Sequence, residues 1–236
     1  MHTQTDIWVG LIVLALFILL LLYLLKLKIY ISSQEQEKDN ERLAIQLYML
    51  KKQLNPHFLF NSFNTLLNII DKDKEMAIEY TENLSGFYKQ ILLAQDREMI
   101  TVAEDIRIVK YYIYMQQRRF GDFLQVKFDV AEEQLVWAIP SLTLQLLIEN
   151  ILKHNDVSKK NILHISISSA QSFLMVSNNI NPRLIPVSST GIGLANIGQR
   201  VMLLTGEDIQ VIQNENEFNV IIPIKKYPHA NSYPGK

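Results

Sequence analysis

The sequence contains no cysteine. Disulfides, thiolate catalysis and metal sites with cysteine ligands are therefore excluded. The five histidines are scattered, and no two of them have a metal-ligand spacing such as HxxxH. Charge of either sign is nearly balanced, with a formal net charge of -1. This balance gives no electrostatic reason to expect a nucleic acid as a partner.

The stretch Ile7–Leu25 has no charged residue. As a helix it would span about 28 Å, close to the roughly 30 Å hydrocarbon core of a bilayer. No lysine or arginine precedes it and no small-residue cleavage site follows, which disfavours a signal peptide. Lys26 and Lys28 follow directly. The positive-inside rule then predicts a short extracytoplasmic end at residues 1–6 and a cytoplasmic remainder.

We therefore expect a single-pass protein of the inner or cytoplasmic membrane. The span is either a tether or the element through which a signal enters, alone or with a membrane partner.

Residues 26–54 predict a signalling helix. Its leucines recur at spacings of four, three and four, at Leu43, Leu47, Leu50 and Leu54. This heptad seam is typical of a parallel dimer, although a single amphipathic helix is the alternative.

Residues 55–98 predict a helical hairpin, with a turn at Asp71–Lys74 and a second amphipathic helix at about Glu75–Ala94. Two such hairpins from a dimer would form a four-helix bundle. Pro56 either starts a new helix after Asn55 or kinks one long helix.

Both interpretations place His57 between two helical registers, on the solvent side, with Asn61 one turn further on the same face. A solvent-exposed imidazole with an ordinary pKa is a competent nucleophile near neutral pH. A lone surface histidine is more often inert, so this stretch does not decide the function by itself.

Residues 99–226 predict an α+β domain. Thr101 and Glu104 form a capping box before a helix that runs to about Arg119. A very apolar helix is expected at Ser141–Asn155, and a further helix after Gly193. Strands are expected at LQVKFDV, NILHISIS and SFLMVSN, which have period-two patterns, and at IQVIQN and FNVIIPIK near the end of the chain. The predicted order is helix, strand, helix, strand, strand, helix, strand, strand. This order favours helices on one face of a mixed sheet, and residues 227–236 are expected to be a loose tail.

A polar cluster ends the apolar helix at Ser141–Asn155. Its members are Glu149, Asn150, Lys153 and His154. An asparagine oxygen can coordinate Mg²⁺, and a lysine can neutralise phosphate oxygens. The alternative is a polar helix end whose cations complement the helix dipole.

Glycine is scarce, with eight residues in 236, so the pair Gly191 and Gly193 before an expected helix is informative. Glycines let a backbone approach phosphates, and a helix N-terminus offers free N–H groups. Position 196 is asparagine, so the GxGxxG pattern of a dinucleotide site is absent.

Together, three stretches resemble the LytS-type membrane sensor histidine kinases. The stretch QLNPHFLFNSFNTL resembles the phosphoacceptor motif of that family. IPSLTLQLLIENILKHN resembles its N box, and GIGLANIGQR its second glycine box. The motifs follow the family's order between about residues 47 and 226. The resemblance implies a dimeric phosphotransfer hairpin followed by a Bergerat-type ATP-binding domain, which is an α/β sandwich.

The resemblance also implies residue roles. His57 would be the phosphoacceptor, Asn61 would position water for dephosphorylation, and Asn150 would hold Mg²⁺. An ATP site would be formed by Glu149, as a catalytic residue, and by Asn150, Lys153, His154, Asn178, Gly191 and Gly193. The implied function is a homodimeric kinase that phosphorylates His57 from ATP. It would then pass the phosphoryl group to an aspartate of a separate response regulator.

One motif departs from the family. Its first glycine box has an aspartate and glycines, whereas this sequence has VSNNINP, with Asn178 at the aspartate position. The departure favours the alternative, a non-catalytic signalling adaptor of the same fold.

Overall fold

A computed structural model describes residues 26, 56–183 and 192–226 of the chain. The chain divides into two units, Met1–Asn61 and Ser62–Lys236. The predicted span Ile7–Leu25 and the leucine seam at residues 43–54 lie outside the described residues. Within the described part, no helix is both long and apolar enough to cross a bilayer.

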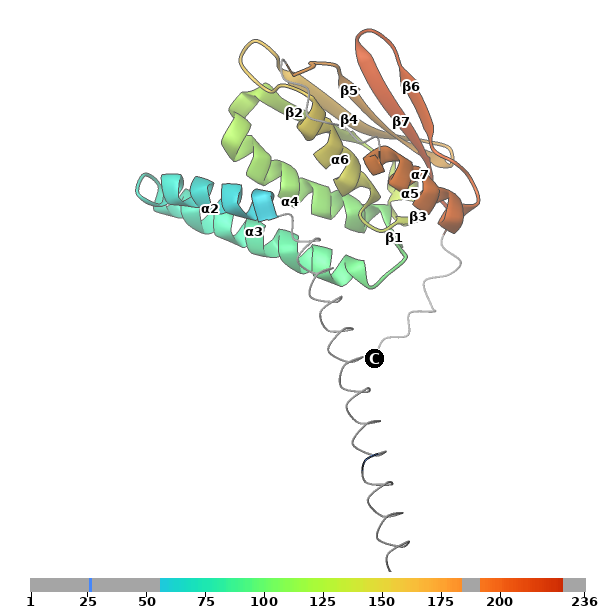
Figure 1. The fold of residues 1–236 in the computed structure, drawn as a ribbon, viewed down its shortest axis with the longest axis horizontal. Coiled ribbons are helices and arrows are strands. Elements are labelled where there is room, and N and C mark those ends of the chain that lie inside the picture. Colours follow the sequence, from blue (N-terminus) through green and yellow to red (C-terminus); the bar gives the residue numbers. More distant parts are fainter. Residues whose placement is uncertain (1–25, 27–55, 184–191, 227–236) are drawn as a thin grey trace, which may run out of the picture. The chain divides into compact units, whose positions relative to one another are not determined.

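Helices α2 (Pro56–Ile70) and α3 (Lys74–Gln95) form the predicted hairpin (Figure 1). The turn between them closes with the Lys72 amide donating to the Ile69 carbonyl at 2.8 Å. The Asp73 side chain then caps α3 by accepting from the Met76 amide at 2.8 Å. An N-cap aspartate satisfies one of the free amides of a first turn, which is why α3 begins here.

Helix α3 packs against α4 (Val102–Phe120) of the following domain. A Cβ atom built on Gly86 would lie 2.8 Å from Cε1 of Tyr111, so any larger residue here would require the Tyr111 ring to move. The Phe87 and Tyr112 rings are 5.6 Å apart. The apolar face of α3 is therefore buried within the chain, and the predicted four-helix bundle stays a prediction.

The main sheet has five strands in the order β2-β4-β5-β7-β6. The pair β2–β4 is parallel and the other pairs are antiparallel, which confirms the predicted mixed sheet. The strands are β2 (Leu124–Asp129), β4 (Leu163–Ala170), β5 (Phe173–Asn179), β6 (Gln210–Gln213) and β7 (Glu217–Pro223).

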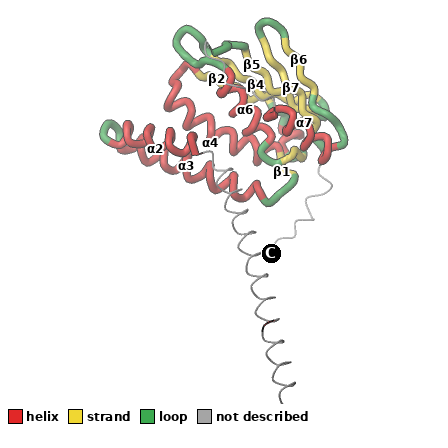
Figure 2. Tube along the Cα trace, in the orientation of Figure 1, coloured by secondary structure: helices red, strands yellow, loops and turns green. Residues whose placement is uncertain are grey.

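Helices α4, α6 (Thr143–His154) and α7 (Ile192–Thr205) cover one face of this sheet (Figure 2). The predicted order of major elements is thus confirmed. The core between the layers is made of aliphatic side chains that include Ile108, Leu144, Leu147, Ile148, Leu163, Ile167, Leu174 and Ile222. Alternation along the strands aims these side chains at the helices.

Four small elements were not predicted, one of them a 3-10 turn at Gly121–Phe123. A two-stranded sheet pairs β1 (Met99–Thr101) with β3 (Ala138–Pro140), and a one-turn helix α5 spans Glu132–Leu135. Three-residue strands are too short to show a period-two pattern, and they form because their partner strand is brought close by the fold.

Candidate functional site

The site is built around α6, whose start is stabilised from another helix. Leu142, which precedes α6, has a left-handed backbone and no side-chain cap. Instead, the Leu144 amide donates to the Asp105 carboxylate of α4 at 2.9 Å. Burial raises the pKa of Asp105 to about 7, against the opposing effects of the nearby amides and of Arg200. The Asp105 side chain of α4 therefore caps the N-terminus of α6.

The other end of α6 is joined to the segment after β5. The Asn155 side chain donates to the Ile151 carbonyl at 2.9 Å and accepts from the Asn181 amide at 2.8 Å. Arg183 donates to the Leu152 and Asn155 carbonyls at 2.9 and 3.1 Å. The Ile151 and Leu152 carbonyls in the last turn of the helix thus have partners, and the segment that follows β5 is placed beside them.

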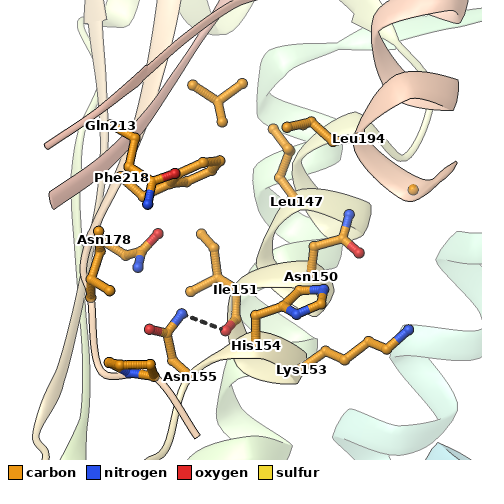
Figure 3. Close-up of a pocket in the computed structure, with 14 residues that line it drawn as sticks. Leu147, Asn150, Ile151, Lys153, His154, Asn155, Asn178, Leu194, Gln213 and Phe218 are labelled. Carbon is orange, nitrogen blue, oxygen red and sulfur yellow. Dashed lines mark hydrogen bonds between the residues drawn. The ribbon is translucent and has the colours of Figure 1, made fainter. Parts of the chain in front are cut away.

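A cavity of about 410 Å³ lies at this end of α6. Asn150, Lys153 and His154 line it from α6, Asn178 lines it from β5, and Gly193 lines it from α7. In Figure 3, Leu147 and Ile151 form an apolar surface between the polar groups of α6 and the sheet. An apolar cavity with a few convergent polar groups is typical of a small-molecule site.

One row of residues crosses three strands on the sheet side of the cavity. Asn178 of β5 pairs with Phe218 of β7, and Phe218 pairs with Gln213 of β6. Figure 3 shows these three side chains on the same wall. The row presents an aromatic ring between two amides, which suits a planar heterocycle with hydrogen-bonding edges.

The Asn178 side chain is 4% exposed, and its two polar atoms differ. Its amide nitrogen donates to the Asn179 carbonyl at 2.7 Å, whereas its oxygen is buried and makes no hydrogen bond within the described residues. A buried acceptor without a donor costs about 1–3 kcal/mol. A ligand that donates to this oxygen would remove that cost.

Gly193 lies against Asn150. A Cβ atom built on Gly193 would be 3.1 Å from the Asn150 side-chain oxygen. A side chain at residue 193 would therefore crowd the Asn150 side chain, and glycine allows the first turn of α7 to approach α6 closely without that crowding. This approach brings the N-terminus of α7 to the cavity.

Three basic side chains lie near the C-terminal end of α6, beside the cavity. Lys153 and His154 line it, and Arg183 lies near enough to act on His154. Desolvation, followed by the charges of Lys153 and Arg183, lowers the pKa of His154. With the N-terminus of α7 nearby, the positive charges of Lys153 and Arg183 favour an anionic ligand.

The structure brings together five of the predicted site residues, namely Asn150, Lys153, His154, Asn178 and Gly193. Glu149 does not line the cavity, contrary to the expectation that it lies beside a triphosphate. It accepts from the Gln145 side chain at 3.0 Å. Burial, and after it the charge of Glu149, raises the pKa of Tyr112 on α4. One residue along a helix is a rotation of about 100°, which turns Glu149 toward α4.

Three predicted residues stay untested. His57 is in the first turn of α2, but its side chain lies outside what the structure describes. Asn61 is also on α2, in the first unit. Gly191 falls outside the described residues.

Four residues of the site were missed from the sequence: Asn155, Arg183, Gln213 and Phe218. Phe218 and Gln213 stood in predicted strands, but their meeting depends on the strand order. Asn155 carried a signal, since asparagine is common at a helix end. Arg183 carried none.

Residues 45–124 match the histidine kinase family model. The sensor histidine kinase YpdA of Escherichia coli K12 is 30% identical over 201 residues, covering 79% of this chain and 35% of that protein. The sensor protein LytS of Enterococcus faecalis is 31% identical over 179 residues, covering 69% of this chain and 30% of that protein. The chain thus spans about a third of the length of these curated relatives.

A solved structure of the catalytic domain of the histidine kinase ThkA is also similar to this chain. The match covers 53% of this chain and 95% of the ThkA domain, with 19% sequence identity and a TM-score of 0.40. The sequence matches confirm the predicted resemblance. The chain is therefore similar in sequence to sensor histidine kinases, LytS proteins among them.

Proposed function

We propose that this chain is a membrane-anchored sensor histidine kinase. ATP binds in the cavity beside α6, and its γ-phosphoryl group is transferred to His57. The phosphohistidine then passes the group to an aspartate of a separate response regulator. The observation that carries this proposal is the cavity itself, in which Asn150, Lys153 and the unsatisfied oxygen of Asn178 converge.

The Asn178 oxygen supports adenine as the base. The exocyclic amine of adenine is a donor, and guanine presents an acceptor at the equivalent place. The amide nitrogen of Asn178 already donates to Asn179, so the free atom of this side chain is an acceptor. We therefore expect ATP to bind more tightly than GTP, with Phe218 beside the base.

The α6 side supports a triphosphate with its magnesium ion. In the described residues no group of three or more His, Asp or Glu side chains could hold a metal ion. Mg²⁺ fits this site because it usually takes one or two protein ligands and otherwise phosphate oxygens and water. Asn150 would supply such a ligand, and Lys153 would neutralise phosphate charge. When bound, the ion would neutralise charge that develops on the phosphate oxygens.

The chemical step needs a neutral imidazole at His57. A ring nitrogen forms a bond to the γ-phosphorus, and the bond from that phosphorus to the bridging oxygen breaks. ADP leaves with the electron pair, and the proton of the other ring nitrogen is released to solvent. Positioning and charge neutralisation are the main contributions a protein makes to such a transfer.

Membrane insertion through Ile7–Leu25 and dimerisation through the leucine seam and hairpin are parts of this proposal. A chain lacking residues 1–33 should stay dimeric in light scattering at micromolar concentration. A monomer would contradict a preformed dimer without affecting the proposed nucleotide site.

The alternative is a non-catalytic adaptor of the same fold, favoured by the missing glycines of the first box. Titration calorimetry of the folded full-length chain with Mg-ATP separates the two. No heat of binding up to millimolar nucleotide would remove the kinase proposal.

Phosphorylation is tested on the full-length chain with γ-labelled ATP and Mg²⁺. We expect one labelled residue, His57, with a phosphate that is labile in acid and stable in base. His57→Gln should abolish the label. His164→Gln is a matched control, because His164 is an exposed histidine on β4. Label that persists at the parental rate in His57→Gln would refute the assignment.

A further inference from the structure

Helix α7 contacts α6 at two places on one face. Gly193 lies against Asn150 near the C-terminal end of α6. Seven residues later, the Arg200 guanidinium donates to the Ser141 carbonyl, just before α6, at 2.8 Å. Seven residues of helix span about 10.5 Å and return to the same face. The two helices therefore run in opposite directions, and α7 meets α6 near both of its ends.

The two contacts differ in kind. Gly193 has no side chain and lies close to the Asn150 side chain, and Ile197 between the two contacts is a buried aliphatic residue. Apolar packing is not directional, so it does not pair particular atoms of the two helices. The bond from Arg200 is charge-assisted and directional. It is the polar contact that fixes how far α7 extends along α6 toward Asn150.

Ser141 is fully buried and uses three polar groups with three partners. Its amide donates to the Glu98 carbonyl at 3.0 Å, its hydroxyl donates to the Arg97 carbonyl, and its carbonyl accepts from Arg200. Arg97 and Glu98 form the connection between α3 and β1. One residue thus joins the end of α3, the start of α6 and the side of α7.

The α3 side of this junction is also fixed. The Arg97 guanidinium binds the Glu104 carboxylate at 2.9 Å, and Glu104 belongs to the capping box of α4. Because α3 packs along α4, a shift of α3 has to be taken up near Arg97 and Glu98. Those are the residues whose carbonyls bind Ser141.

We propose that Arg200 is a positioning residue of the nucleotide cavity, and that its bond to Ser141 couples the end of α3 to the contact between Gly193 and Asn150. This inference rests on the proposed function, since it concerns the same cavity. Arg200 lies outside the cavity lining and acts through α7. The coupling joins α3 to the site that would hold the phosphoryl donor.

The test compares full-length Arg200→Met with the parental chain. The matched control is Arg107→Met, which removes the same charge from an exposed position on α4. Without nucleotide, the Ile197 and Gly198 amides of α7 should exchange hydrogen about tenfold faster in Arg200→Met. Affinity for Mg-ATP should fall about tenfold, as expected for losing one charge-assisted hydrogen bond. The control should match the parental chain in both measurements.

Coupling has its own readout. In the parental chain, saturating Mg-ATP should slow exchange of the Ser141 amide. In Arg200→Met this protection should disappear, even at nucleotide concentrations that saturate the variant. A residue that only stabilised the fold would not remove protection selectively at Ser141.

The inference would be overturned if the Ile197 and Gly198 amides of Arg200→Met exchanged hydrogen at the parental rate and the variant bound Mg-ATP with the parental affinity. If that variant does not fold, Arg200→Gln carries the same test with the same criteria. If the parental chain binds no Mg-ATP, the proposed function fails. The exchange of α7 without nucleotide then still decides whether Arg200 holds this helix.

Discussion

The two ends of α6 differ in how completely their polar groups are paired. At the N-terminal end, Ser141 uses its amide, hydroxyl and carbonyl, and the Leu144 amide binds Asp105. At the C-terminal end, a cavity of about 410 Å³ collects Lys153, His154 and a buried Asn178 oxygen that has no hydrogen bond within the described residues.

This difference indicates that the N-terminal end of α6 has a structural role and that its C-terminal end faces a ligand site. Buried polar groups are nearly always paired in folded proteins. A buried group without a partner beside a cavity therefore indicates a ligand, whereas a fully paired group indicates a fixed joint. Asp105 is the partial exception at the N-terminal end, because one of its oxygens is also unpaired within the described residues.

The largest expected effect concerns Asp105 and the dependence of stability on pH. Its pKa is raised from 3.8 to about 7 in the folded chain. Between these values the native state binds one more proton than the unfolded state, so the free energy of unfolding falls as pH rises from about 4 to about 7. The slope approaches about 1.4 kcal/mol per pH unit, a few kcal/mol in all.

Asp105→Asn keeps an acceptor for the Leu144 amide and should remove this part of the slope. Denaturant unfolding between pH 4 and 8 measures it. Asp122→Asn, at an exposed carboxylate, is the control and should keep the parental slope. Equal slopes in all three chains would show that Asp105 does not titrate in this range.

The next effect is at the opposite end of α6. Asn150→Ala should weaken Mg-ATP binding at least about a hundredfold, since it removes the proposed magnesium ligand. Stability should change by less than about 1 kcal/mol, because Asn150 is only half-buried. Calorimetric titration and denaturant unfolding measure the two quantities, with Asn83→Ala on α3 as the control. If Asn150→Ala lowered the free energy of unfolding without weakening Mg-ATP binding, the C-terminal end of α6 would have a structural role and the proposed magnesium ligand would be wrong.

Asn178→Asp should have opposite effects on affinity and stability. A carboxylate accepts more strongly from an adenine amine, so affinity for ATP should rise, by less than about tenfold. The free energy of unfolding should fall by about 1–3 kcal/mol, because the aspartate cannot donate to the Asn179 carbonyl. The same two measurements apply. Weaker ATP binding in this variant would mean that the Asn178 oxygen does not meet the base.

The smallest effect is expected for Arg183→Met. Arg183 is exposed, and its two bonds to the Leu152 and Asn155 carbonyls should contribute about 0.5–1 kcal/mol. The pKa of His154 should rise, because Arg183 contributes to lowering it, but should stay below its ordinary value because desolvation is the main cause. Titration of the histidine ring by NMR measures this change. An unchanged pKa would place Arg183 too far from His154 to matter.

Most of the fold was predictable from local patterns. The capping box of Thr101 and Glu104 starts α4 as predicted, and period-two stretches became strands β2, β4, β5, β6 and β7. The site was predictable in part, through Asn150, Lys153, His154, Asn178 and Gly193. Glu149 was misplaced because helical phase relative to a neighbour depends on packing. Gln213, Phe218 and Arg183 were missed because their neighbours come from distant segments.

The sequence by itself determined the periodicities, the caps and three motifs in order, because these depend on residues a few positions apart. Only the tertiary structure decided which polar groups are paired. Ser141 and Arg200 are 59 positions apart, which is too far for a local sequence pattern to link them. Their bond exists because α6 and α7 pack in opposite directions. The Asn178 oxygen stays unpaired for a related reason. Asn178 is buried in the sheet, and its side chain lines the cavity.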